Sequence, residues 1–332
     1  MIVACYVDDL CIAYNHTSEL QWFAHKYKRR FKCTGPNPLT KFMGIEVSRV
    51  PGRISISQTA YIQSMFDKYL SGVHTKLWTT PVGTSESELQ KFMELKCANS
   101  DASQTAMADK PYMSIMGSIL FCACMTRPDI QYCASHLCQF MADPTTACFE
   151  AAQGVLSYLQ RTKDLAITYV KTNKVELLLY FDSSWGRAPR AQSGHVVMLC
   201  RAGISWSSRR LKIVPQSSCE AETSAGCAGC KDLMYVHGVM SDLYLPRSPI
   251  PVYTDNKGTY DIVRNPGVTA RTRHFERWLH YMRYLFSRNF IDIFLVSTND
   301  MYADIFTKAV NRHILLMCRR FIMNEDAFTS IQ

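Results

Sequence analysis

The chain has 332 residues, of which 47% are hydrophobic and 20% are charged. This composition excludes an intrinsically disordered chain, and the length predicts two domains or one domain with a large appendage. Thirty-seven Lys and Arg against 28 Asp and Glu give a formal net charge of +9, which favours a polyanionic partner such as nucleic acid; a merely soluble basic protein is the alternative.

In the first half of the chain, residues 1–14 predict a β-hairpin with Asp8 and Asp9 at its tip. Adjacent carboxylates suit divalent cations, but Asp is also common in turns, and from the residues alone the polar turn is the better interpretation. The following pattern predicts a helix over 18–31, strands over 41–50 and 53–57, a helix over 58–69, a loop or linker over 81–109, and scaffold helices over 111–141 and 146–160.

The second half alternates strands with helices. The pattern predicts strands over 175–181, 194–200, 204–207, 252–255 and 291–296, and helices over 220–243, 256–264, 273–288 and 302–310. Three antiparallel strands followed by helices and two further strands indicate an α/β fold, with helices packed on a mixed five-stranded sheet.

Four acidic side chains stand at the ends of these predicted elements: Asp182, Glu220, Asp255 and Asp304. If the strands before Asp182 and Asp255 are parallel neighbours, both carboxylates emerge at one edge of the sheet. Glu220 and Asp304 fall in the first turn of helices, where each alone is explained as a helix cap. Four clustered acids repel one another unless cations neutralise them, and oxygen ligands select Mg²⁺ or Mn²⁺.

Cysteine is abundant, with 14 residues, but its spacing does not form a disulfide framework. Cys227 and Cys230 form a C-x-x-C pair, as zinc and redox proteins use, yet no second pair or neighbouring His completes a metal set. We therefore expect both to pack in a core. No signal peptide is expected at Met1, and the longest apolar stretch, residues 114–125, is too short to span a bilayer.

At these acids the chain resembles the ribonuclease H domain of copia-type LTR retrotransposon Pol polyproteins. The resemblance rests on six segments in family order: Tyr180-Phe181-Asp182-Ser183-Ser184-Trp185, Ile204-Ser205-Trp206-Ser207-Ser208, Ser217-Ser218-Cys219-Glu220-Ala221-Glu222, Tyr253-Thr254-Asp255-Asn256, Arg271-Thr272-Arg273-His274 and Ala303-Asp304-Ile305-Phe306-Thr307-Lys308. It implies a ribonuclease H-like sheet, with Asp182, Glu220, Asp255 and Asp304 as the catalytic acids and metal ligands.

The activity implied is hydrolysis of the RNA strand of an RNA–DNA hybrid with two Mg²⁺ ions, or Mn²⁺ in their place. Contacts to the substrate are expected from basic side chains, for which a solvated face is the alternative: Arg273, His274, Arg277, Arg209 and Arg210. Without a signal peptide or an apolar stretch long enough to span a bilayer, the chain is expected to be intracellular, in the cytoplasm within a virus-like particle or in the nucleus, and to have no membrane partner.

The resemblance extends upstream. Tyr6-Val7-Asp8-Asp9 resembles the metal-binding hairpin of a reverse-transcriptase palm, and Thr126-Arg127-Pro128-Asp129-Ile130 resembles the segment that joins polymerase to nuclease. We therefore expect a truncated palm and following region over 1–80, a linker and connection helices over 81–174, the ribonuclease H-like domain over 175–312, and a tail over 313–332. Asp8 and Asp9 are expected to be vestigial, and no DNA synthesis is expected from this chain alone.

Three positions depart from the family pattern: Ser184 replaces its second acid, Thr223 a tyrosine and Glu276 an aspartate. These departures support an alternative, in which the chain is a non-catalytic relic that binds nucleic acid or docks on a full-length reverse transcriptase. The four intact acids favour the enzyme.

Overall fold

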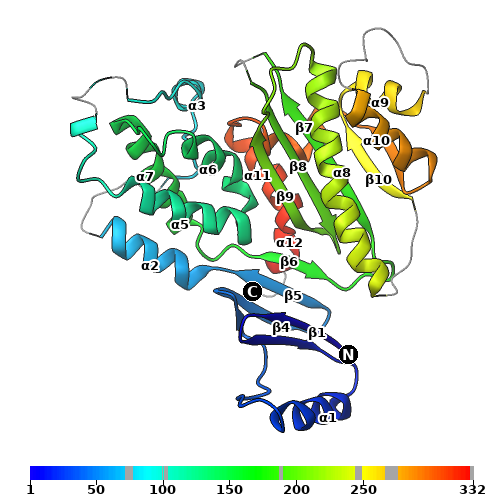
Figure 1. The fold of residues 1–332 in the computed structure, drawn as a ribbon. Coiled ribbons are helices and arrows are strands. Elements are labelled where there is room, and N and C mark those ends of the chain that lie inside the picture. The colour runs from blue at the N-terminus through cyan, green and yellow to red at the C-terminus, as the bar shows by residue number, and fades with distance from the viewer. Residues whose placement is uncertain are drawn as a thin grey trace.

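A computed structural model describes residues 1–71, 78–98, 100, 104–186, 190–243, 249–265 and 276–329. The first strands, β1 (Ile2–Tyr6) and β2 (Asp9–Ala13), form the expected hairpin, and α1 (Thr17–Lys28) follows it. At the end of the molecule that carries the N-terminus, this hairpin lies beside the strands formed by residues 41–57 (Figure 1), and the rings of Tyr6 and Phe42 make an edge-on contact with centroids 6.5 Å apart. Every residue of β1 is exposed.

A second sheet is antiparallel and has the order β3-β4-β5-β6. Its strands are β3 (Lys41–Phe42), β4 (Ile45–Val50), β5 (Arg53–Ser57) and β6 (Ile167–Val170), and α2 (Thr59–Tyr69) follows β5. The sequence pattern did not predict β6. This short strand lies more than 100 residues further along the chain and forms one edge of the sheet. The sheet therefore combines strands from the expected palm-like region with one from the expected connection region.

Helices dominate the middle of the chain and share one apolar core. They are α3 (Glu86–Met93), α5 (Tyr112–Met125), the short 3-10 helix η1 (Pro128–Ile130), α6 (Gln131–Cys138) and α7 (Thr146–Arg161). The expectation of a loop throughout 81–109 is wrong at α3. A capping box holds that helix, because Ser85 accepts a hydrogen bond from the Glu88 N–H and the Glu88 carboxylate accepts one from the Ser85 N–H.

The five-stranded sheet has the order β11-β10-β7-β8-β9. Its strands are β7 (Leu177–Ser184), β8 (Gln192–Leu199), β9 (Ala202–Arg210), β10 (Ile250–Thr254) and β11 (Ile291–Leu295). β7, β8 and β9 are antiparallel neighbours, whereas β10 is parallel to both β7 and β11. The expected mixed five-stranded α/β fold is therefore confirmed.

Helices cover both faces of this sheet. The long α8 (Ser218–Asp242) runs along one face with α10 (Glu276–Ser287) and α9 (Lys257–Arg264) beyond it (Figure 1). Small residues bring α8 close to β7: a Cβ at Gly226 would lie 2.9 Å from the Phe181 ring, and one at Gly229 would lie 3.0 Å from Leu179. Cys227 and Cys230 are buried on this helix, so the expectation that they pack in the core is confirmed.

The other face packs against the 3-10 helix η4 (Tyr302–Phe306) and α11 (Arg312–Met323), which α12 (Glu325–Thr329) follows. The expected tail over 313–332 is thus corrected, because α11 contributes the buried side chains of Leu315, Cys318 and Ile322 to the core. The helix expected over 302–310 is also shorter than predicted, since only residues 302–306 are helical. This short element places Asp304 next to β7.

Candidate metal centre

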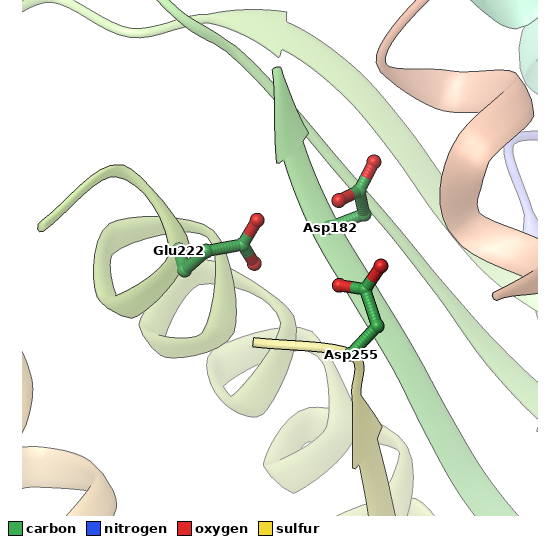
Figure 2. A group of neighbouring side chains, drawn as sticks. All are labelled: Asp182, Glu222 and Asp255. Atoms are coloured by element: carbon green, nitrogen blue, oxygen red, sulfur yellow. The ribbon is translucent and has the colours of Figure 1, made fainter. Parts of the chain in front are cut away.

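Three carboxylates meet at the end of the five-stranded sheet: those of Asp182, Glu222 and Asp255. Each offers an oxygen, and these oxygens all lie within 4.8 Å of one another. Figure 2 shows the three side chains converging from β7, from α8 and from the end of β10. Among the described residues, no other group of three or more His, Cys, Asp or Glu side chains lies this close together.

Asp182 lies within β7, because the strand continues to Ser184, and it is 5% exposed. Its partner across the sheet is Gly194 on β8. A Cβ at Gly194 would lie 2.6 Å from the Cβ of Phe306, so only glycine lets η4 approach the sheet here. The close approach allows the Thr307 hydroxyl to donate a hydrogen bond to Asp182 Oδ2. One oxygen of Asp182 is therefore held in place by the protein itself.

Glu222 comes from the second turn of α8 and is 4% exposed. Its Oε1 accepts hydrogen bonds from the Ser183 N–H at 3.0 Å and from the Ser183 hydroxyl at 3.1 Å. Its Oε2 is buried and has no hydrogen-bond partner in the described structure. Burial, and then the neighbouring Asp182, raise the pKa of Glu222 well above its ordinary value.

Asp255 directly follows β10, whose parallel pairing with β7 brings the ends of both strands to one edge. Burial and the charge of Asp182 raise the pKa of Asp255, while a hydrogen bond with Thr298 opposes the rise. The expectation that Asp182 and Asp255 lie together at one edge of the sheet is borne out by this geometry.

Glu220 was expected in this group, but the structure brings Glu222 to it instead. The Glu220 carboxylate accepts a hydrogen bond from the Gln216 N–H at 2.6 Å, and the Glu220 N–H donates to the Ser217 hydroxyl at 3.2 Å. Glu220 is therefore part of the cap of α8. The sequence contains the signal, because Ser217-x-x-Glu220 has the spacing of a capping box, which leaves Glu222, two residues further on, as the acid that can face the sheet.

Asp304 lies beside the group and is 4% exposed. Its Oδ1 is 2.9 Å from Lys308 Nζ, an ion pair one helical turn apart. Burial, and then Asp182, raise the pKa of Asp304 to about 7, with Lys308 opposing the rise. Burial alone would lower the pKa of Lys308, but the charges of Asp182 and Asp304 raise it. Lys308 thus compensates part of the negative charge of the site.

The donors of this site fit a hard divalent cation. All are carboxylate oxygens, and Glu222 Oε2 has no hydrogen-bond partner in the part of the chain that the structure describes. The carboxylates of Glu222, Asp255 and Asp304 have raised pKa values because they are buried close to Asp182. A bound cation would relieve this repulsion. Zinc prefers nitrogen and sulfur ligands, which this group does not offer.

The other predicted contact residues are more scattered. Arg209 and Arg210 are exposed on β9, where Arg210 donates a hydrogen bond to the Gln139 side chain, and Arg277 is exposed on α10. Arg273 and His274 lie outside the described residues. Asp8 and Asp9 are exposed at the hairpin tip and do not belong to the carboxylate group.

Comparison with known proteins gives sequence relatives over most of the chain. Residues 1–82 match the family model described as reverse transcriptase (RNA-dependent DNA polymerase). The chain is 31% identical over 313 residues to the retrovirus-related Pol polyprotein from transposon RE1 of Arabidopsis thaliana, which covers 92% of this chain and 20% of the relative. It is 30% identical over 226 residues to a putative transposon Ty5-1 protein of Saccharomyces cerevisiae, covering 66% of this chain and 70% of that protein.

The chain therefore spans about a fifth of the length of the polyproteins from transposons RE1 and RE2. Similar solved structures include the N-terminal RNase H domain of rv2228c from Mycobacterium tuberculosis, with 15% identity, a TM-score of 0.31 and coverage of 44% of this chain and 98% of that one. They also include a foamy viral protease-reverse transcriptase in complex with dsDNA, with 13% identity, a TM-score of 0.40 and coverage of 89% and 55%. Among the described helices, none is long and apolar enough to cross a lipid bilayer.

Proposed function

Because the chain belongs to the family of copia-type retrotransposon Pol polyproteins, we propose that its five-stranded unit hydrolyses the RNA strand of RNA–DNA hybrids. The observation that carries this proposal is the convergence of Asp182, Glu222 and Asp255, whose oxygens lie within 4.8 Å of one another. Buried carboxylates at this spacing destabilise the empty site and suit a reaction that uses divalent cations.

Asp182, Glu222 and Asp255 would hold the metal, with Asp304 at its border; we propose two Mg²⁺ ions, with Mn²⁺ able to replace them. When bound, such ions activate water for attack on phosphorus and stabilise the leaving oxygen. Glu222 therefore takes the role that was expected of Glu220.

The protein's own contribution is to fix the ligand oxygens before substrate arrives. Ser183 donates to Glu222 Oε1 through its N–H and its hydroxyl, whereas Oε2 is buried and has no hydrogen-bond partner among the described residues. Thr307 binds Asp182 Oδ2 from the opposite face of the sheet. Both carboxylates are thus oriented by neighbours that do not themselves carry charge, and orientation of this kind lowers the cost of assembling the reacting groups.

Lys308 has a second use in this proposal. Its ammonium group pairs with Asp304 and is influenced by Asp182 and Asp255. It therefore places a positive charge at the border of an acidic site that must accept a polyanion, and it offsets the repulsion between the carboxylates and a phosphate.

Substrate selection would come from contacts outside the acids. We propose that exposed Arg209 and Arg277 bind phosphates, and that contacts to 2′-hydroxyl groups distinguish the RNA strand. The hairpin with Asp8 and Asp9 is proposed to be inactive in DNA synthesis, because these exposed acids do not form a three-ligand group with any other described side chain.

The test is cleavage of an end-labelled RNA–DNA hybrid in Mg²⁺ by the wild-type chain and by Asp182→Asn, which keeps the shape of the side chain and removes its charge. We expect at least about a 100-fold loss in the variant, since even outer-shell partners of a metal typically contribute 10–100-fold. Asp242→Asn is the matched control, because Asp242 is exposed at the far end of α8. Folded wild-type protein that binds the hybrid but leaves it intact would support the non-catalytic alternative.

A further inference from the structure

Trp185 stands on the edge of the sheet that carries the acids, directly after β7. Tryptophan is usually well buried, yet 48% of this residue is exposed. Its indole N–H donates a hydrogen bond to the Pro215 carbonyl at 3.0 Å, just before the N-terminus of α8. The ring is therefore fixed in orientation while about half of its surface faces solvent.

A basic side chain lies on the same side of this edge. Arg209 pairs across the sheet with Ser193, which pairs with Ser183, so these three side chains share one face. That face is the one covered by α8, since the Ser183 hydroxyl donates to Glu222. Arg209 is exposed there, whereas Arg210 points to the opposite face and binds Gln139. An anchored aromatic ring and an exposed cation, which also interacts with Asp232, therefore stand at the same end of the sheet as the carboxylate group.

The chemistry of Trp185 and Arg209 indicates which kind of ligand they can bind. Exposed aromatic rings interleaved with basic side chains bind single-stranded nucleic acid, because each unpaired base offers a π-face for stacking and each phosphate offers a charge. Bases inside a duplex already stack on each other and cannot cover an indole. Away from its ends, a fully paired hybrid would therefore offer the Trp185 ring no base to stack on.

We propose, on the basis of the function above, that Trp185 and Arg209 bind an unpaired nucleotide that flanks the hybrid, so that the enzyme prefers junctions between hybrid and single strand. Three residues of extended chain separate Asp182 from Trp185, a distance of roughly 10 Å. Stacked nucleotides rise about 3.4 Å each, so the junction lies about three nucleotides from the cleaved bond.

The binding test uses the chain with Asp182→Asn, which keeps the hybrid intact. The probes are a labelled blunt RNA–DNA hybrid and the same hybrid with a five-nucleotide single-stranded extension at one end. We expect tighter binding of the extended probe, and a loss of this preference of roughly tenfold in Trp185→Ala. Trp185→Phe should retain it to within about threefold, because phenylalanine keeps an aromatic face.

Trp185→Ala and Trp185→Phe both lose the indole hydrogen bond to Pro215. The difference in probe preference between these two variants therefore reports stacking, separately from the structural role of that bond. Trp22→Ala is the matched control, since Trp22 is 61% exposed on α1, in the N-terminal part of the molecule. Arg209→Gln should weaken binding of both probes and reduce the slope of log affinity against log salt by about one.

Equal binding of the two probes by the chain with Trp185 present would overturn the inference, as would a preference that survives in Trp185→Ala. Cleavage by the wild-type chain separates this result from the proposed function. A chain that cleaves hybrids without preferring junctions retains the proposed function and lacks the nucleotide site. A chain that prefers the extended probe without cleaving any hybrid retains the nucleotide site and lacks the proposed activity.

Discussion

The two glutamates at the start of α8 should respond in opposite ways to the same substitution. Glu222→Gln removes a charge whose oxygen lies within 4.8 Å of oxygens of Asp182 and Asp255. At an effective dielectric constant of about 20, two unit charges at that distance repel by about 3 kcal/mol. The variant should therefore be inactive, by at least about 100-fold, yet the metal-free protein should be up to about 3 kcal/mol more stable at pH 8.

Glu220→Gln should show the reverse. The glutamine can still accept the hydrogen bond from the Gln216 N–H, so the cap geometry survives, but the negative charge near the N-terminus of α8 is lost. That charge is worth about 0.3–1 kcal/mol to a helix. We expect this variant to be slightly less stable and to cleave hybrids at a rate within about threefold of the wild type.

The assay pairs hybrid cleavage in Mg²⁺ with thermal unfolding in EDTA and in Mg²⁺. The wild type and Glu220→Gln should both be stabilised by the metal, whereas Glu222→Gln should lose that response. Full activity in Glu222→Gln together with inactivity in Glu220→Gln would refute the assignment of Glu222 as the ligand and would restore Glu220.

Three further predictions concern other parts of the chain. In EDTA, the free energy of unfolding should fall as the pH rises from about 4 to about 7. Burial and Asp182 raise the pKa of Asp304 from 3.8 to about 7, so the folded protein binds the proton more tightly than the unfolded chain does, and stability is lost as that proton leaves. The loss is at most about 4 kcal/mol, and Asp304→Asn should flatten the dependence of the unfolding free energy on pH over that range. Tyr158→Phe should lower the free energy of unfolding in denaturant by about 1–3 kcal/mol, because it removes the acceptor of Arg319 Nη1 and a donor to Asp129, while Arg319 stays paired with Glu325. An unchanged midpoint would contradict a structural role for the Tyr158 hydroxyl. Primer extension should stay at background, and extension abolished by Asp9→Asn would show that the hairpin is catalytic.

The architecture of the second half was predictable because its strands are apolar on both faces. Leu177, Leu179 and Phe181 pack under α8, while Tyr180 packs on the side of η4 and α11, and a strand of this type reads as a continuous apolar run. The carboxyl ends of β7 and β10 then bring Asp182 and Asp255 to one edge. These two members of the site follow from pattern and from the rule for parallel strands.

The third member depends on a finer distinction. Glu220 and Glu222 are two residues apart, so they project about 200° apart around a helix, and only one can face the sheet. The pattern of apolar residues did not choose between them. The capping spacing from Ser217 does so, because it commits the Glu220 carboxylate to the start of the helix. The feature that distinguishes Glu222 from Glu220 is therefore the local capping pattern of α8, and not the pattern of apolar residues.

The parts that could not be predicted depend on contacts between distant segments. β6 is only four residues long and pairs with β5 more than 100 residues earlier, so neither its length nor its pattern identifies its partner. The shortening of the helix expected after residue 302 likewise reflects tertiary packing, since η4 must fit beside Gly194.

The C-terminal helices connect regions that the sequence presents as separate. Arg319 on α11 donates a hydrogen bond to the Tyr158 hydroxyl at 2.9 Å, and that hydroxyl donates to Asp129 at 2.6 Å. Asp129 is in turn paired with the fully buried Arg127, which also binds Thr162. A chain of charged and polar groups this deeply buried is costly unless every member is satisfied, so these segments must fold together.

The same helices reach the N-terminal sheet. Asn324, between α11 and α12, donates to the Thr168 carbonyl of β6, and Arg53 of β5 donates to the Ala327 carbonyl. Figure 1 shows α12 beside β6. α11 also packs against η4, which carries Asp304 and precedes Thr307. A fragment that ends at residue 312 would therefore retain the acids while losing the helix that holds η4 against the sheet. The catalytic unit we infer includes the connection helices and α11 as well as the five strands.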